Sequence, residues 1–425
     1  MAALWRRTGR AGEVAEIYLH AAQALTVDLD PASGLLQESL GASHHATVRL
    51  WTPEGSGRAE GWWRTVEELE GLIAAARAST SRSPVPPPEG LGAPVGEERP
   101  AGALSAERAR ALATGWAREL EPLGTCIQAL LVQQSFGWCG VYHSSGFSTH
   151  DWLAREQALV RCETPNGAVV DGVATPRLDG TLDLSPATER LRAACEVLQG
   201  QGAGLDPSLP LVLRPPVAGP LVSGLAWALL GDVAASVPGL VRAVGKKIFP
   251  SVLSVLDDPL HPEGTVRRLT DDEGRRAAPV MSIQAGQLLG FFHSHASAAG
   301  LGVTSNGRAL RAQRGEPSPG TFNFHVVPRG GSLPADRTEL VARVETFTTM
   351  RQPGVVSLLA WGWEYRGGSR HRRVGPLELE LPVLSIFRQV QAVGPDLTFL
   401  PACDGCGTPT LILSPPTWLG DSGSR

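Results

Sequence analysis

The sequence predicts an α+β protein with two domains, an N-terminal α+β domain followed by a C-terminal, mainly antiparallel β domain. The strands expected in the first half follow one another as hairpins and do not alternate with helices, as strands of a parallel sheet would. After a glycine-rich break at residues 200–204, strand-like segments dominate and helical patterns are scarce. With 42% hydrophobic and 19% charged residues, the 425-residue chain can bury full cores in two or three domains.

The first elements are predicted from periodicity and from one helix-start signal. Residues 13–26 predict a helix that leads into a strand, and strands are expected at residues 34–40 and 45–51. The second of these strands shows the period-two alternation of a half-buried strand. Thr65 is expected to cap a helix that ends near residue 78, because Glu68 follows at the spacing of a capping box.

A segment rich in proline, glycine and serine, residues 79–104, predicts a linker or mobile loop. Beyond it, Ser105 is expected to cap the next helix. Strands at residues 127–133 and 138–145 are predicted to form a hairpin that turns at residues 136–137.

The remaining elements complete the domain assignment. Helices are expected at residues 186–198 and 221–235, and strands at residues 156–163, 167–175, 209–213, 251–256, 279–292, 321–327, 341–350, 355–365, 377–387 and 408–413. The expected boundaries are residues 1–78 and 105–204 for two parts of the N-terminal domain, 79–104 for the segment between them, and 205–425 for the second domain.

The longest apolar run, from Val217 to Gly231, indicates a buried helix. It is shorter than the roughly 20 residues that a helix needs to cross a bilayer. The N-terminal residues lack the apolar core of a signal peptide. We therefore expect a soluble, cytoplasmic protein with no membrane partner.

Several classes of function have no support in the sequence. A net charge of −4 and tryptophans with few interleaved basic residues argue against a nucleic-acid partner. Nucleophile-elbow and phosphate-loop motifs are absent, and the glycine-rich residues 200–204 do not match a dinucleotide fingerprint. These residues are better interpreted as a domain-boundary loop.

The pair Cys403 and Cys406 forms a C-x-x-C motif that we interpret as a plain loop. A zinc site would need two more ligands, and a redox pair would stand at the start of a helix. A strand follows here instead, so we predict that the pair is dispensable, with metal binding and redox chemistry as the open alternatives.

Two further clusters could bind metal but have simpler interpretations. If the chain is extended at His293 and His295, both imidazoles lie on one face of a strand, where a carboxylate could complete a metal site. Histidines on a surface or in a cleft are the commoner case. The run Asp271-Asp272-Glu273 is expected to be a solvated turn, because a calcium loop spreads its ligands over twelve residues.

The second half of the chain resembles the TldD/TldE (PmbA) family of metallopeptidases in the order and spacing of short motifs. These motifs are Pro215-Pro-Val-Ala-Gly219, Gly231-Asp232, Asp257-Asp-Pro259, Thr270-Asp-Asp-Glu-Gly274, Gly286-Gln-Leu-Leu-Gly290, Thr304-Ser-Asn-Gly-Arg308 and Pro328-Arg-Gly330. The resemblance also covers the early block from Glu38 to Ala78. It implies a peptidase framework over nearly the whole chain.

The chain departs from the resemblance at the zinc motif. TldD-type members carry H-E-x-x-x-H on the apolar helix, where the histidines bind zinc and the glutamate acts as general base. The matching positions here are Ser223, Gly224 and Ala228, none of which can bind zinc or move a proton. The resemblance therefore implies a TldE-like subunit without catalytic or metal-binding residues, whose zinc is expected in a TldD-like partner.

The same resemblance implies further features of such a subunit. Its substrates would be unfolded or short peptides, including leader segments of ribosomally made natural products. We expect His293, His295, Arg308 and Asn323 to line this chain's half of the peptide cleft. The small residues on the apolar helix, Gly224 and Ala228 among them, are expected to lie against the partner.

Two alternatives remain open at this point. The chain could be a metal-independent enzyme that uses His293, His295 or Cys403. It could also be a repurposed peptide-binding or structural protein. The sequence leaves open whether the chain has any activity alone.

Overall fold

The structure of the chain is a computed structural model. It describes residues 1–82, 86–87, 99, 101–123, 126–180, 182–237, 239–311, 315–345, 349–352 and 354–416. Most of the segment predicted as a linker, residues 79–104, lies outside the described residues. The α+β class predicted from the sequence is confirmed.

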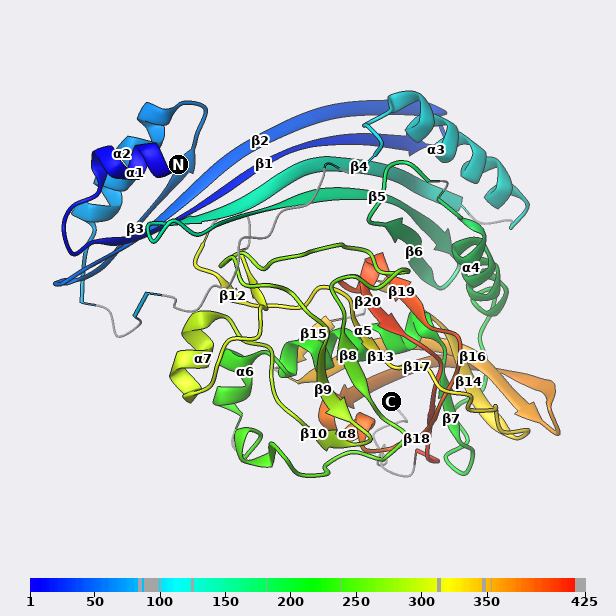
Figure 1. Cartoon of the computed structure of the whole chain (residues 1–425). Coiled ribbons are helices and arrows are strands. Elements are labelled where there is room, and N and C mark those ends of the chain that lie inside the picture. The colour runs from blue at the N-terminus through cyan, green and yellow to red at the C-terminus, as the bar shows by residue number, and fades with distance from the viewer. Residues whose placement is uncertain are drawn as a thin grey trace.

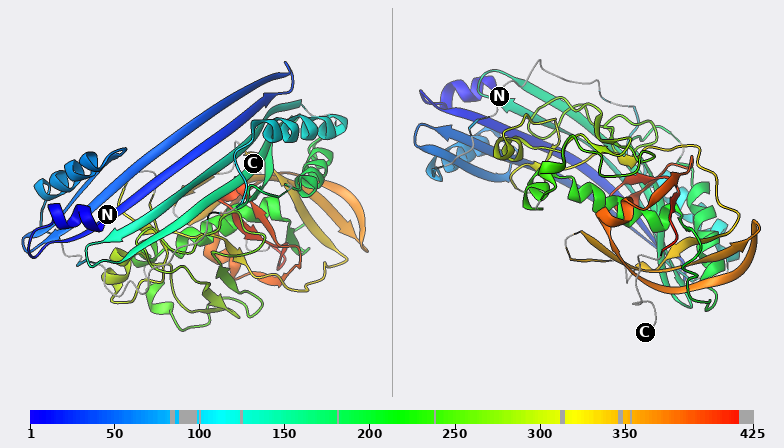
Figure 2. Two further views of the ribbon diagram at one scale, coloured as in Figure 1. Left: turned by 45° about the horizontal axis from the view of Figure 1, so that its top comes forward. Right: turned by 90° about the horizontal axis from the view of Figure 1, so that it is seen from below.

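One antiparallel sheet of long strands organises the N-terminal domain. Its described strands lie in the order β3-β2-β1-β4-β5-β6. They are β1 (Val14–Asp30), β2 (Leu35–Thr52), β3 (Gly55–Trp62), β4 (Cys126–His143), β5 (Ser148–Thr164) and β6 (Gly167–Thr175). The long strands arch as one curved layer over the C-terminal domain (Figure 1), and Figure 2 shows the same layer from two further sides. This layer forms one wall of the site described below.

Helices pack at both ends of the long strands (Figure 1). They are α1 (Ala2–Thr8) and α2 (Val66–Ala78) at one end, and α3 (Ala106–Leu120) with the short helix η1 (Glu121–Leu123) and α4 (Ser185–Val197) at the other. Both predicted caps are confirmed: Thr65 forms a capping box with Glu68, and Ser105 accepts a hydrogen bond from the Arg108 amide. Trp116 on α3 is 1% exposed and anchors the core beneath α3 and α4.

Three sequence predictions in this domain are wrong because long-range pairing overrides local patterns. Residues 13–26 form no helix, since β1 pairs with β2 along its entire length. The two strands expected at residues 34–40 and 45–51 are one strand, β2. The expected hairpin turn at residues 136–137 lies inside β4. A Cβ atom at Gly137 would lie 2.3 Å from the Ala21 carbonyl oxygen, so this glycine permits a close approach between strands.

Two sheets build most of the C-terminal domain. The described strands of the first lie in the order β10-β9-β8-β13-β20-β19, and those of the second in the order β15-β16-β14-β7-β21-β18, with β17 paired to β16. The pairs β13–β20 and β7–β14 are parallel, and the other described pairs are antiparallel. The second domain is therefore mainly antiparallel, as the sequence predicts.

The elements of this domain are short except for one hairpin. Its strands are β7 (Leu211–Leu213), β8 (Val255–Asp257), β9 (Val280–Gln284), β10 (Gln287–Leu288), β11 (Ala309–Leu310), β12 (Ser318–Pro319), β13 (Phe324–Val326), β14 (Arg337–Arg343), β15 (Thr349–Gln352), β16 (Val355–Arg366), β17 (Ser369–Pro382), β18 (Val390–Val393), β19 (Thr398–Leu400), β20 (Cys406–Thr408) and β21 (Leu411–Leu413). Its helices are α5 (Pro215–Ala228), α6 (Gly231–Ser236), η2 (Val241–Ala243), α7 (His295–Leu301), α8 (Val383–Phe387) and η4 (Pro401–Cys403).

Helix α5 contacts strands of both sheets and lies in the core of this domain. The single helix predicted at residues 221–235 is two helices, because the chain is extended at Leu230, where it pairs with Phe292. Within the described residues, no helix is long and apolar enough to cross a membrane.

Candidate functional site

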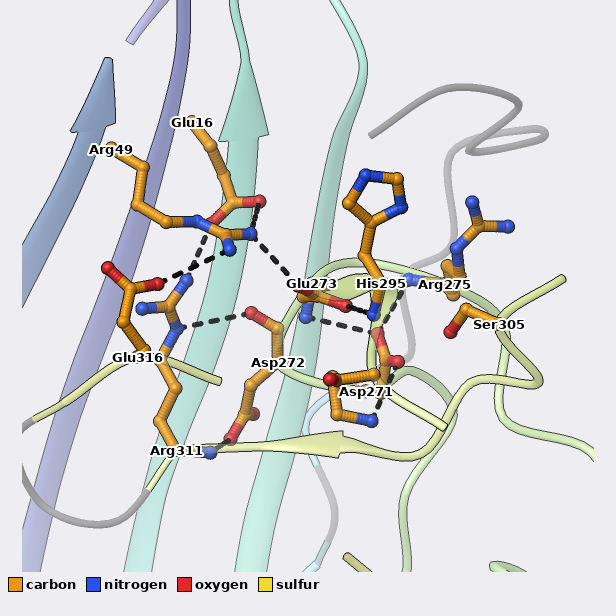
Figure 3. Close-up of polar contacts among 12 residues, drawn as sticks. Glu16, Arg49, Asp271, Asp272, Glu273, Arg275, His295, Ser305, Arg311 and Glu316 are labelled. Atoms are coloured by element: carbon orange, nitrogen blue, oxygen red, sulfur yellow. Dashed lines mark hydrogen bonds and ion pairs between the residues drawn. The ribbon is translucent and has the colours of Figure 1, made fainter. Parts of the chain in front are cut away.

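The acidic run Asp271-Asp272-Glu273 lies between the N-terminal sheet and the C-terminal domain, where Figure 3 shows it facing the strands. The sequence-based prediction of a solvated turn is wrong, because these three side chains are only 1%, 3% and 0% exposed. Burial of a charged group is costly unless it is paired. Some partners of these carboxylates are close in the sequence, such as Arg268 for Asp272, and others, such as Arg49 for Glu273, come from distant segments.

Arg49 of β2 joins the sheet to the acidic run (Figure 3). It donates to Glu16 of β1 at 3.0 and 2.5 Å and to Glu273 at 3.1 Å. Glu273 also accepts a hydrogen bond from the His295 amide at 2.7 Å. Burial alone would raise the pKa of Glu16, but the charges of Arg49 and Arg311 lower it, so the carboxylate stays ionised.

Two further arginines join the contact that Glu16, Arg49 and Glu273 make between the sheet and the acidic run, which we call the junction. Arg311 donates to Glu16 at 2.5 Å, and its guanidinium lies 5.0 Å from the ring centre of Tyr18. Arg268 donates to Asp272 at 2.6 Å and to Asp151 of β5 at 3.3 Å. The charges at the junction therefore neutralise one another across the two domains, which fixes the sheet over the acidic run.

Asp271 differs from its neighbours because amide groups surround it. Its carboxylate accepts hydrogen bonds from the backbone amides of Glu273, Arg275 and Ala309 at 3.0, 2.8 and 3.0 Å. Burial and the nearby charge of Glu273 raise the pKa of Asp271 to about 7. This carboxyl group is thus poised to change its protonation near neutral pH.

A cavity of about 390 Å³ opens beside this junction. Its floor is the inner face of β1 and β2, which contributes Tyr18, His20 and Thr47, and its opposite wall includes Arg268 and Leu310. A volume in this range is typical of small-ligand clefts. The cavity lies between the two domains, a common location for a binding site.

The positions that the resemblance relates to a zinc motif lie on α5 and offer no ligands. Ser223 donates a hydrogen bond to Asp404 at 2.6 Å. A Cβ atom at Gly224 would lie 2.9 Å from Val383, and Ala228 is 4% exposed. The expectation that this small-residue face contacts a partner chain is wrong for Gly224 and Ala228, because the chain's own core covers them.

Cys403 and Cys406 lie beside α5 and not in an isolated loop. A Cβ atom at Gly219 would lie 2.8 Å from the Cys403 sulfur, and both cysteines are buried. Burial raises the pKa of both thiols, which opposes the thiolate form that zinc needs. Among the residues that the structure describes, no three His, Cys, Asp or Glu side chains gather as a metal site. These side chains therefore do not fit a zinc ion.

Arg308 and Asn323, expected in a peptide cleft, are both 0% exposed. Arg308 is paired with Asp257 and also donates to the Ala278 carbonyl group. Asn323 accepts hydrogen bonds from the Thr265 and Val266 amides at 2.9 and 3.2 Å. Both side chains are used in holding loops together, so we do not extend the cleft proposal to them.

The two histidines do not share a strand face, so that sequence prediction is wrong. Ser294 caps helix α7, which begins at His295. His293 is 4% exposed, its Nδ1 lies 3.2 Å from the Ser297 hydroxyl group, and burial lowers its pKa. The His295 ring lies near the surface, with Nε2 2.9 Å from the Pro86 carbonyl oxygen. In Figure 3 this ring points away from the carboxylates.

The sequence analysis missed Glu16, Arg49, Arg268 and Arg311 as site residues. Arg49 and Glu273 are separated by 224 positions in the chain. One available signal was the presence of Glu16 and Arg49 inside strand-like segments, since charged residues are rarely buried unless paired. No local pattern indicates that Arg49 pairs with Glu273, whereas Arg268 lies only four residues before its partner Asp272.

The whole fold has counterparts among solved structures. A proposed modulator of a DNA gyrase from Thermotoga maritima matches with a TM-score of 0.78 and 14% identity over 97% of both chains. TldE from Thermococcus kodakarensis matches with a TM-score of 0.77 and 18% identity over 94% of this chain and 95% of that one. A third match is a proposed modulator of DNA gyrase from Bacteroides thetaiotaomicron, with a TM-score of 0.73 and 15% identity over 97% and 95%.

The C-terminal domain defines the class of protein. Residues 207–418 match the family described as the PmbA/TldA metallopeptidase C-terminal domain. The chain therefore belongs to the TldD/PmbA family, as its sequence motifs predict. No curated protein matches the sequence.

Proposed function

We propose that the chain is the non-metal-binding, TldE-like subunit of a heterodimeric TldD/TldE-type zinc metallopeptidase that acts on unfolded or short peptides. The observation that supports this most strongly is helix α5, which keeps its place in the family's C-terminal domain while presenting Ser223, Gly224 and Ala228. A partner with a complete zinc motif would supply the Lewis acid and the general base. This chain would close the peptide cleft around them.

The free part of β2 is the place where we propose that the partner binds. Strand β3 pairs with the segment from His45 to Thr52, and beyond His44 the residues 35–43 have no neighbour on that side among the described strands. Leu35 and Leu40 are 54% and 68% exposed there. An unpaired strand edge is a template for a strand from another chain. This edge replaces the α5 face as the proposed contact with the partner.

Main-chain geometry indicates which groups of this edge are free. The Trp63 amide donates to the His44 carbonyl oxygen on the side where β3 lies. In an antiparallel strand the amide and carbonyl groups of every second residue point to the same side. The corresponding groups of Ala42 and Leu40 therefore point to the open edge.

Co-expression with a TldD-like chain tests the proposal. We expect a 1:1 complex whose peptidase activity is abolished by chelators. Ala42→Pro should weaken the complex at least tenfold, because proline removes an edge amide, whereas the control Ala42→Ser should stay within about twofold. Separate elution of the two chains at micromolar concentration, together with full peptidase activity of the TldD-like chain alone, would contradict the proposal.

A further inference from the structure

The cavity beside the acidic run has walls of two kinds. Tyr18, Leu153 and Leu310 supply aromatic and apolar surface, and the indole of Trp62, which is 56% exposed, stands at the same cavity. Arg268 and Arg311 supply charge. If the two arginines were unpaired, the cavity would favour an anionic ligand. If they are already paired within the chain, the aromatic and apolar surface determines which ligand binds.

The charges at the wall are already compensated within the chain. Arg268 is paired with Asp151 and Asp272. Arg311 is paired with Glu16 at 2.5 Å. Burial also lowers the pKa of His20, which keeps this ring neutral at pH 7. A charged ligand would find no unpaired counter-charge here and would lose its hydration, whereas an uncharged group pays no such cost.

One buried polar atom at the wall lacks a partner. Thr47 is 1% exposed, lines the cavity, and its Oγ1 has no hydrogen-bond partner within the described part of the chain. A buried hydroxyl group without a partner costs free energy, so such groups are normally satisfied. A ligand that carries an amide or hydroxyl group beside an apolar body would satisfy it.

We propose that this cavity is a specificity pocket for one uncharged, apolar or aromatic side chain of a bound peptide, with Thr47 as a hydrogen-bonding partner. The inference rests on the proposed function, because it takes the ligand to be a peptide. The volume of about 390 Å³ accommodates one large side chain with its adjoining amide groups. The pocket selects among peptide side chains by excluding charged ones. The rest of the peptide lies along the sheet that forms the floor of the pocket.

The test uses single amino acids, each N-acetylated and C-amidated, as ligands. The probes then differ only in their side chains. N-acetyl-phenylalanine amide and N-acetyl-leucine amide are titrated into the purified full chain by calorimetry, alongside the lysine and glutamate equivalents. We expect saturable binding of the two uncharged probes and at least tenfold weaker binding of the two charged ones. Equal binding of charged and uncharged probes would overturn the inference.

Variants locate the binding in the cavity. Leu153→Trp fills the cavity and should weaken binding of the phenylalanine probe at least tenfold, whereas Val303→Trp adds the same ring at a position that is 51% exposed and should have no effect. Thr47→Val keeps the shape and removes the hydroxyl group, and should weaken binding about fivefold even if Leu153→Trp does not fold. Unchanged affinity in Thr47→Val and in a folded Leu153→Trp would overturn the inference.

The experiments distinguish an error in the pocket inference from an error in the proposed function. If no probe binds saturably, the pocket is excluded, but the subunit proposal stands on complex formation. If the TldD-like chain forms no complex yet the uncharged probes still bind at Thr47, the proposed function fails and the cavity remains a binding site for uncharged amides.

Discussion

Helix α5 and the junction around the acidic run are both deeply buried, but α5 is surrounded by apolar side chains and the junction consists of charged ones. At α5, the positions Gly224 and Ala228 are small and packed among apolar side chains. At the junction, Arg49, Glu16 and Glu273 bury charge between two domains. The helix that the resemblance relates to a zinc motif is thus packed with small and apolar side chains, and the ionised groups gather where the domains meet.

The comparison shows that the two buried regions have different structural roles. The small residues of α5 serve packing against the chain's own apolar core. Buried ion pairs are weak sources of net stability, but losing one partner leaves an uncompensated charge. The junction therefore makes the placement of the sheet over the C-terminal domain sensitive to single changes.

The largest effect is expected from breaking the junction. Arg49→Met leaves Glu273 buried without its arginine and should lower the free energy of unfolding by about 3–5 kcal/mol. The control Arg7→Met removes a surface pair with Glu70, in which the Arg7 side chain is 63% exposed, and should cost less than about 1 kcal/mol. Equal losses in urea unfolding would show that the junction does not hold the domains together.

A second effect concerns pH. The pKa of Asp271 is raised to about 7 in the folded chain, so the native state keeps a proton that the unfolded state releases near pH 4. Its contribution to stability is therefore present below about pH 4 and is lost as the pH rises to about 7, by at most about 1.4 kcal/mol per pH unit.

Asp271→Asn removes this titration. Relative to the parent chain, the variant should therefore gain stability as the pH rises from 5 to 7 and show a constant difference above about pH 7. Urea unfolding of both chains at several pH values measures the difference. A difference that is flat across this range would contradict the assignment of the raised pKa to Asp271.

A smaller effect is expected at α5. Gly224→Val places methyl groups against Val383 and Val356 and should cost about 1–3 kcal/mol by overpacking. The neighbouring control Ser223→Ala loses the hydrogen bond to Asp404 and should cost about 0.5–1.5 kcal/mol. If Gly224→Val were neutral in thermal unfolding, the face would have space for a partner's side chain after all.

Local signals in the sequence predicted the helix starts but not the charged junction. Thr65 and Ser105 were predicted as caps because capping depends on residues three positions apart. Ser294 followed the same rule, with Gly302 in a left-handed conformation after the helix, and this signal was overlooked in favour of a strand. Helix starts that carry a capping residue are therefore within reach of the sequence alone.

The errors share a physical cause, which is contact between distant segments. Gly137 indicated a turn, but it is required where β4 closely approaches Ala21 of β1. The acidic residue Glu273 indicated solvent exposure, because its arginine partner Arg49 lies 224 positions away in the chain. The family motifs identified the framework, whereas the cavity depends on which residues the long strands place face to face.

The zinc content of the chain purified alone shows whether this subunit binds metal by itself. We expect no stoichiometric zinc, because Ser223, Gly224 and Ala228 supply no ligand and burial raises the pKa of the thiols beside α5. Elemental analysis of the complex with a TldD-like chain should in contrast give one zinc per heterodimer. One tightly bound equivalent of zinc in this chain alone would contradict this expectation and would make Cys403, Cys406 and the histidines the first candidates for its ligands.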